Sequence, residues 1–254
     1  LIMDNDDLPG ARLIGLKKFG DTYYSNPGFR QWSASGLAVV WAEENTRDSI
    51  FNAFRRKETY ATSGNRIKLR FFAGENLDDT SLSNEDLINN AYSKGVPMGG
   101  DLTGLEESPD FLVWAVRDTR GAPLQRVQII KGFAENAIGE PVGRPNEQVY
   151  DVACSDGLEV DPETHRCADN GAKVNLSDCS ISSNLGASEL KAYWKDPDFN
   201  PTQKAFYYVR VLENPTCRWS TWDAIRNGVE PRPDLHKTLQ ERAWSSPIWY
   251  TPEA

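Results

Sequence analysis

The chain has 254 residues, a formal net charge of -9, 39% hydrophobic residues and 26% charged residues. This composition is typical of a globular protein, and the acidic balance argues against a nucleic-acid partner, which requires clustered Lys and Arg. There is no apolar run of about 18 residues, so we expect no membrane span.

The first ten residues, LIMDNDDLPG, have neither a basic segment nor a long apolar segment, so they do not have the pattern of a signal peptide. Position 1 is Leu rather than an initiator Met. We therefore expect the chain to be a processed or partial piece of a longer protein. Further along, GLAVVWA (36–42) is a short apolar run of the kind that forms buried strands.

A helix is predicted over residues 46–57, with Asn45 as its N-cap. Ile50, Phe51 and Phe54 lie on one face of this helix, as in an amphipathic helix that packs on a core. The strand RIKLRFFA (66–73) follows, and its apolar and basic residues alternate through Phe71. This alternation predicts a half-buried strand.

The hinge between this helix and strand is TSGNR (62–66). A turn that contains Gly can direct backbone N–H groups at an anion, and Ser63 and Arg66 could add donors. The alternative is a plain connector, with Arg66 on the solvent face of its strand. The residues alone leave both interpretations open.

Strands dominate the chain after residue 96, and short helices are expected at 83–95, 188–194 and 220–227. The predicted strands are FLVWAV (111–116), LQRVQIIKG (124–132), EQVYDVA (147–153), AFYYVRVLE (205–213) and AWSSPIWYT (243–251). Several strands joined by irregular loops indicate a mainly antiparallel, sandwich-like β domain. With the earlier helix and strand, the expected fold class is α+β.

The four cysteines are Cys154, Cys167, Cys179 and Cys217. None forms a CxxC pair and the chain has only two His, which argues against a zinc cluster. Their even number and loop positions favour disulfides, and of the three connectivities we expect the local pairs Cys154–Cys167 and Cys179–Cys217. Such bonds would indicate an oxidising compartment. The alternative is four unpaired thiols.

Other polar residues fit a metal or catalytic site less specifically. Glu43 and its neighbour could supply a metal ligand or a general base, or only favour the start of the helix. Asp196 and Asp198 have the spacing of a calcium loop, but a proline stands where an EF-hand needs Gly, which favours a turn. His165 and His236 are far apart and indicate no catalytic triad. Six of the eight Trp residues fall in or beside the predicted β region and could line a carbohydrate or small-molecule site or fill the core: Trp114, Trp194, Trp219, Trp222, Trp244 and Trp249.

Several long motifs resemble the bacterial domain-of-unknown-function 3604 family, over residues 33–252. They are WAEENTRDSIFNAFRRKETYATSGNRIKLRFFAG, VPMGGDL, FLVWAVRD, LQRVQIIKG, DPDFNPTQKAFYYVRVLENPTCRW and QERAWSSPIWYTP. The resemblance implies an exported protein whose N-terminal domain is a distorted barrel of the polymerase-and-histidinol-phosphatase (PHP) type. Such a domain binds divalent metals (Zn, Mn, Mg or Ca) and hydrolyses esters, typically phosphoesters.

The resemblance also implies a division of this chain. Residues 1–65 would be the last helix and strand elements of the PHP-like barrel, and residues 66–254 a C-terminal β-sandwich with short helices in its loops. Asp21-Thr22-Tyr23 resembles a family Asp-Thr-His motif with Tyr in place of His, so Asp21 is a candidate metal ligand. Ser63, Arg66 and Glu43 are candidates for contacts to the substrate or to the metal ligands.

The expected function is the C-terminal portion of a periplasmic or extracellular metal-dependent hydrolase, with the metal site mostly outside this chain. Its expected partner is the N-terminal PHP-like domain or another missing segment of the same protein, and the sequence leaves a homo-oligomer open. The alternative is a non-catalytic β-sandwich module that binds a ligand or another subunit.

Overall fold

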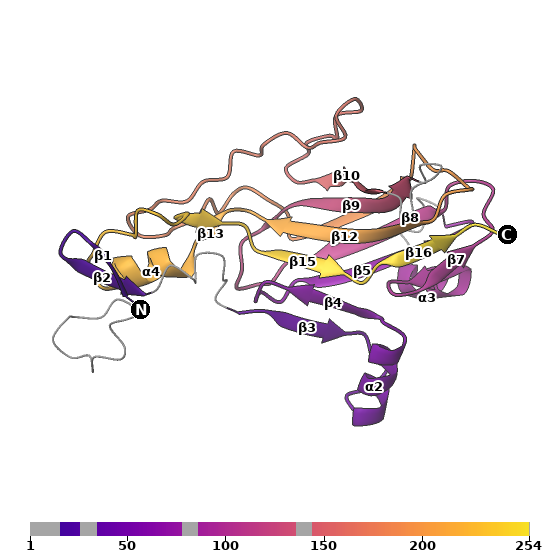
Figure 1. The fold of residues 1–254 in the computed structure, drawn as a ribbon, viewed down its shortest axis with the longest axis horizontal. Helices are drawn as coiled ribbons and strands as arrows, with labels where there is room; N and C mark the ends of the chain where they lie inside the picture. Colours follow the sequence, from indigo (N-terminus) through magenta and orange to yellow (C-terminus); the bar gives the residue numbers. More distant parts are fainter. Residues whose placement is uncertain (1–15, 26–34, 78–85, 136–143, 254) are drawn as a thin grey trace.

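The computed structural model describes residues 16–25, 35–77, 86–135 and 144–253, and Figure 1 shows their arrangement. Most strands belong to one sheet of eight strands or to another of four. The described helices are α2 (Arg47–Arg55), α3 (Leu87–Lys94) and α4 (Trp219–Arg226). The described chain is therefore mostly antiparallel β-structure with few helices, as predicted. Its sheets form no closed barrel, and the PHP-like origin of residues 1–65 stays a prediction.

The larger sheet has the strand order β10-β9-β12-β15-β4-β3, and β16 pairs with both β12 and β7. Only the β16–β7 pair is parallel among these. The strands are β3 (Leu37–Val40), β4 (Thr59–Thr62), β7 (Asp101–Thr103), β9 (Leu124–Glu135), β10 (Arg144–Cys154), β12 (Ala205–Glu213), β15 (Arg242–Ser245) and β16 (Ile248–Thr251). The edge position of β3 leaves it half exposed, whereas its apolar sequence predicted a buried strand.

The smaller sheet has the order β11-β8-β5-β6 and is entirely antiparallel. Its strands are β5 (Lys68–Gly74), β6 (Gly95–Pro97), β8 (Asp110–Val116) and β11 (Glu189–Lys195). The main core lies between the two sheets: Phe111 of β8 contacts Tyr207 of β12, with ring centroids 4.6 Å apart. Residues 188–194, predicted to be helical, form most of β11 because they pair with β8 along its length.

The outer face of the smaller sheet carries a second apolar cluster beneath α3. Phe72 of β5 and Leu112 of β8 pack there with Ala91 of α3. This layer explains why both faces of the 111–116 strand are apolar, as its sequence indicated. It also buries Phe72, whereas Leu69 and Phe71 belong to the main core.

Smaller elements, the hairpin β1–β2 and α4 among them, are drawn at one end of the sheets in Figure 1. The strands are β1 (Leu16–Phe19), β2 (Thr22–Ser25), β13 (Thr216–Cys217) and β14 (Thr238–Leu239). The structure contains both expected disulfides, Cys154–Cys167 and Cys179–Cys217. No described helix is long and apolar enough to cross a membrane.

Helix α2 differs from its prediction in its cap and in its packing. Its N-cap is Thr46 rather than Asn45, because the Thr46 hydroxyl accepts the N–H of Ser49. The helix extends away from the two sheets in Figure 1. Its buried residues are Ser49 and Ala53, while the side chains of Phe51 and Phe54 are 59% and 52% exposed. The apolar face therefore lies largely in solvent.

The expected domain boundary at residues 65–66 falls in the turn between β4 and β5, which belong to different sheets. Strand β4 pairs with β15 near the end of the chain. The segment before the boundary is thus hydrogen-bonded to strands that follow it. The division into two separate domains stays a prediction.

Candidate functional site

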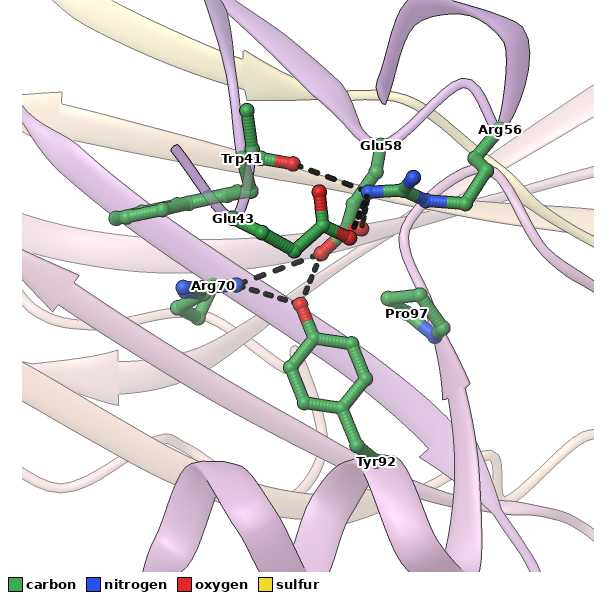
Figure 2. A pocket seen from close by; sticks show the side chains of 8 residues that line it. Trp41, Glu43, Arg56, Glu58, Arg70, Tyr92 and Pro97 are labelled. Carbon is green, nitrogen blue, oxygen red and sulfur yellow. Dashed lines mark hydrogen bonds and ion pairs between the residues drawn. The ribbon is translucent and has the colours of Figure 1, made fainter. Parts of the chain in front are cut away.

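A pocket of about 510 Å³ opens beside α2, at the edge of both sheets (Figure 2). It brings together side chains from α3, β5 and β6, from the segment that follows β3, and from the segment between α2 and β4. The lining residues are Trp41, Ala42, Glu43, Arg56, Glu58, Arg70, Tyr92 and Pro97. Two carboxylates, two guanidinium groups and a phenol therefore meet in one hollow.

The backbone at the end of α2 places Glu58 in this pocket. Lys57 has a positive φ of 60°, which ends the helix and lets the Glu58 N–H donate to the Ala53 carbonyl at 3.1 Å. The Glu58 carbonyl then accepts the N–H of Trp41 at 3.0 Å. This last bond holds the segment after β3 against the segment before β4.

Glu58 is the buried centre of the site, with only 4% of its side chain exposed. Its Oε1 accepts from Arg70 Nη1 at 3.4 Å, and its Oε2 accepts from Arg56 Nη2 at 3.4 Å. The Tyr92 hydroxyl also donates to Oε1 (Figure 2). These partners compensate the burial of the carboxylate, and they occupy it, so Glu58 is suited to hold the arginines in place.

Tyr92 of α3 connects Glu58 to Arg70. Its hydroxyl accepts from Arg70 Nη1 at 2.8 Å while it donates to Glu58. Burial, together with the hydrogen bond to Glu58, raises the pKa of Tyr92 to about 12. Tyr92 therefore keeps its proton at neutral pH and stays a donor.

Trp41 fixes the opposite side of Arg70. Its indole N–H donates to the Leu69 carbonyl at 2.8 Å, and the Arg70 guanidinium carbon lies 3.4 Å from the ring centroid. A second cavity, of about 250 Å³, shares Trp41 and Arg70 with the first. Its other lining residues are Lys68, Ile88, Trp114 and Val116, so it is largely apolar.

Glu43 lies at the mouth of the pocket, with 70% of its side chain exposed. Its Oε2 accepts from the Ser49 hydroxyl at 2.9 Å, and its Oε1 lies 3.1 Å from Arg56 Nη2. A hydrogen bond from its own backbone N–H and the one from Ser49 lower the pKa of Glu43. Of the residues selected from sequence, Glu43 alone lines this pocket.

Ser63 and Arg66 are not among the residues that line it. The Ser63 N–H and hydroxyl both bond the backbone of Arg242, and the Arg66 N–H donates to Asp118 Oδ2 at 2.8 Å. Gly64 has a φ of +124°, and a Cβ there would lie 2.4 Å from Ser35 Oγ, so the turn needs glycine. The N–H groups of Ser63, Gly64 and Arg66 thus all have acceptors within the protein, which favours the connector interpretation.

The other polar candidates lie apart from the pocket. Asp21 is exposed in the turn between β1 and β2. Asp196 is a buried partner of Lys131 Nζ at 2.7 Å and of the Tyr207 hydroxyl at 2.7 Å. Over the described ranges, no three His, Cys, Asp or Glu side chains gather as they would around a metal. The described residues therefore do not fit the divalent metal that the resemblance implies.

Sequence reasoning missed five polar or aromatic members of the site: Trp41, Arg56, Glu58, Arg70 and Tyr92. Arg56 fits the positive charge that favours a helix C-terminus, and Arg70 fits the polar face of its strand, so neither residue indicates a site by itself. Both explanations are local. No local pattern in the sequence could have found these residues, because they meet only through the tertiary structure.

The fold and the pocket define a disulfide-bonded, mainly antiparallel β protein with an arginine-containing pocket beside a projecting helix. The chain belongs to the family described as protein of unknown function (DUF3604), whose model matches residues 11–252. Searches of the curated proteins and of the solved structures gave no significant match.

Proposed function

We propose that this chain is the C-terminal portion of an exported metal-dependent hydrolase, acting on phosphoesters or other esters, whose metal ligands come mostly from outside this chain. The described residues would form a lobe that braces the N-terminal PHP-like domain. They would also contribute the pocket that contains Glu43 and Arg56 to the substrate site. The two disulfides support a periplasmic or extracellular location.

One observation carries the proposal: the exposed apolar face of α2 adjoins the polar pocket. Arg56 is the C-cap of α2 and lines the pocket, while Phe51 and Phe54 on the same helix are 59% and 52% exposed. Exposed aromatic side chains beside a polar hollow are typical of a surface that another domain covers. A domain on this face would lie over the pocket mouth and could bring its metal site to it.

The metal would activate water and polarise the ester or phosphoryl oxygen when bound. Within this chain, the guanidinium groups of Arg56 and Arg70 would orient an anionic substrate, and Glu58 would hold them. Asp21, the candidate metal ligand, is exposed and remains a proposal.

The test compares the intact source protein with the 254-residue chain. Metal content is measured together with hydrolysis of p-nitrophenyl phosphate and p-nitrophenyl acetate. We expect bound divalent metal and hydrolysis in the intact protein, both lost on chelation. An intact protein of no more than 28.5 kDa, or one without metal and without hydrolysis, would contradict the proposal.

The docking of α2 has its own test in the intact protein. Replacing Phe51 and Phe54 by Asp places charge on the proposed contact, so we expect lower thermal stability and reduced hydrolysis. The matched control is Leu176→Asp, since Leu176 is 39% exposed in a different region. If Leu176→Asp lowers thermal stability and hydrolysis as much as the double variant does, the proposed role of α2 is contradicted.

The second candidate is a non-catalytic binding or subunit-interaction module. The cavity lined by Trp41 and Trp114 favours this second candidate, because aromatic surfaces of this kind can bind small molecules without catalysing a reaction. Metal-free intact protein that binds a ligand or another subunit, a homo-oligomer included, would support this candidate over the hydrolase.

A further inference from the structure

The two arginines of the pocket have donors to spare. Arg56 makes its three polar contacts through Nη2, with Trp41 O at 3.5 Å, Glu58 Oε2 at 3.4 Å and Glu43 Oε1 at 3.1 Å. Arg70 makes its hydrogen bonds through Nη1. A guanidinium has five N–H donors. Within the described part of the chain, Nε and Nη1 of Arg56 and Nε and Nη2 of Arg70 have no hydrogen-bond acceptor.

Both guanidinium groups are held in place before any ligand arrives. They share the Glu58 carboxylate, and Arg70 is also fixed between the Tyr92 hydroxyl and the Trp41 ring. The Arg70 side chain is only 20% exposed. Because little freedom is left to lose, binding of an acceptor to these donors costs little conformational entropy.

Glu43 occupies an acceptor position on the same guanidinium group, at Arg56 Nη2. Its carboxylate contacts Arg56 from the solvent side of the pocket and is 70% exposed (Figure 2). Exposed ion pairs contribute little to stability, so an incoming oxyanion can displace this one. Glu58 differs, because it is buried and has three partners.

We propose that the pocket binds small molecules with an oxyanion head, a carboxylate, phosphate or sulfate, which takes the position of the Glu43 carboxylate on Arg56 and reaches Arg70. The neighbouring cavity with Trp41, Ile88 and Trp114 offers apolar surface to a flat body attached to that head. Glu43 is thus an internal competitor that limits affinity. This site needs only the present chain, so it stands or fails separately from the proposed hydrolase.

The test is a titration of the 254-residue chain with benzoate, phenyl phosphate and phenyl sulfate, by calorimetry and by tryptophan fluorescence. The three probes distinguish the possible heads, and phenol serves as the neutral control. We expect at least one oxyanion to bind tenfold or more tightly than phenol. Failure of all three to exceed phenol would overturn the proposal.

Two pairs of variants locate the binding. Arg56→Gln should weaken binding about tenfold, whereas Arg55→Gln, one residue earlier at the exposed end of α2, should leave it unchanged. Glu43→Gln should strengthen binding several-fold, and the adjacent Glu44→Gln should not. Circular dichroism checks that each variant is folded. Weaker binding by Glu43→Gln, or equal losses for Arg55→Gln and Arg56→Gln, would contradict the assigned geometry.

Discussion

The guanidinium of Arg70 lies over the indole of Trp41, with its central carbon 3.4 Å from the ring centroid. The two residues are far apart in sequence, and the Trp41 indole N–H bonds Leu69, the residue before Arg70. Trp41 follows β3, a strand of the larger sheet, and Arg70 lies on β5, a strand of the smaller sheet. The contact therefore joins the two sheets. It is also the wall shared by the two cavities.

Trp41→Ala should destabilise the chain by roughly 2 kcal/mol, because it removes a half-buried ring, its hydrogen bond and the cation–π contact. Urea unfolding followed by circular dichroism measures the change. Trp249→Ala is the control, since Trp249 is 44% exposed. If the control loses as much stability as Trp41→Ala, the Trp41–Arg70 contact is not an important connection.

Tyr92→Phe should lower the free energy of unfolding by about 1–2 kcal/mol, because the buried Glu58 carboxylate loses a hydroxyl donor. The control is Tyr208→Phe, whose hydroxyl makes no hydrogen bond among the described residues and should have little effect. In a spectrophotometric titration at 295 nm, the wild-type chain should contain a tyrosine that ionises near pH 12. Because the pKa values of Tyr150 and Tyr207 are also raised, the readout is the difference between the two titrations near pH 12. Identical titrations of the wild type and of Tyr92→Phe would show that another residue is responsible.

Glu213 predicts a pH dependence of stability away from the pocket. It is 1% exposed, its Oε2 accepts the Ala122 N–H at 3.3 Å, and its Oε1 lacks a hydrogen-bond partner among the described residues. Burial raises its pKa from 4.5 to about 7; the nearby Asn65 amide opposes this rise without good hydrogen-bond geometry. The folded chain therefore holds a proton that the unfolded chain releases between these pH values.

The free energy of unfolding should consequently fall as pH rises from 4.5 to about 7, by at most about 3 kcal/mol from this group. Glu213→Gln removes the titrating group and should flatten that part of the profile. Urea unfolding at half-unit pH steps gives both curves. Parallel profiles for the two proteins would show that Glu213 is not the source.

The disulfides should each stabilise the chain by about 2–4 kcal/mol, and more for the bond that closes the longer loop. Cys179–Cys217 spans 38 residues and Cys154–Cys167 spans 13. Replacing each pair by Ser, with unfolding measured by urea, should therefore show the larger loss for the first pair. No loss in either double variant, with dithiothreitol also without effect on the wild type, would mean that the bonds are absent in solution.

Local patterns were sufficient for much of the β-structure. The alternation of Ile67, Leu69 and Phe71 with basic residues predicted the buried face of β5 and of the residue just before it, because successive strand residues point to opposite sides. The same rule failed at residues 188–194, where the expected short helix is strand β11. There, pairing with β8 outweighed the local preference.

The helix before the hinge shows the limit of an amphipathic pattern. Periodicity placed Ile50, Phe51 and Phe54 on one face, but no local rule states what that face contacts. In the structure Phe51 and Phe54 are largely in solvent. Packing is a property of the surrounding elements, so only the tertiary structure reveals the exposed face.

The sequence by itself determined a globular, acidic, mainly antiparallel β chain, the positions of most strands and the favoured cysteine pairs, since these depend on composition and on neighbours along the chain. Only the tertiary structure decided that Trp41, Glu58, Arg70 and Tyr92 form one pocket. Their meeting depends on strand order and on the packing of α3 over the smaller sheet. Contacts between residues so distant in sequence leave no local pattern.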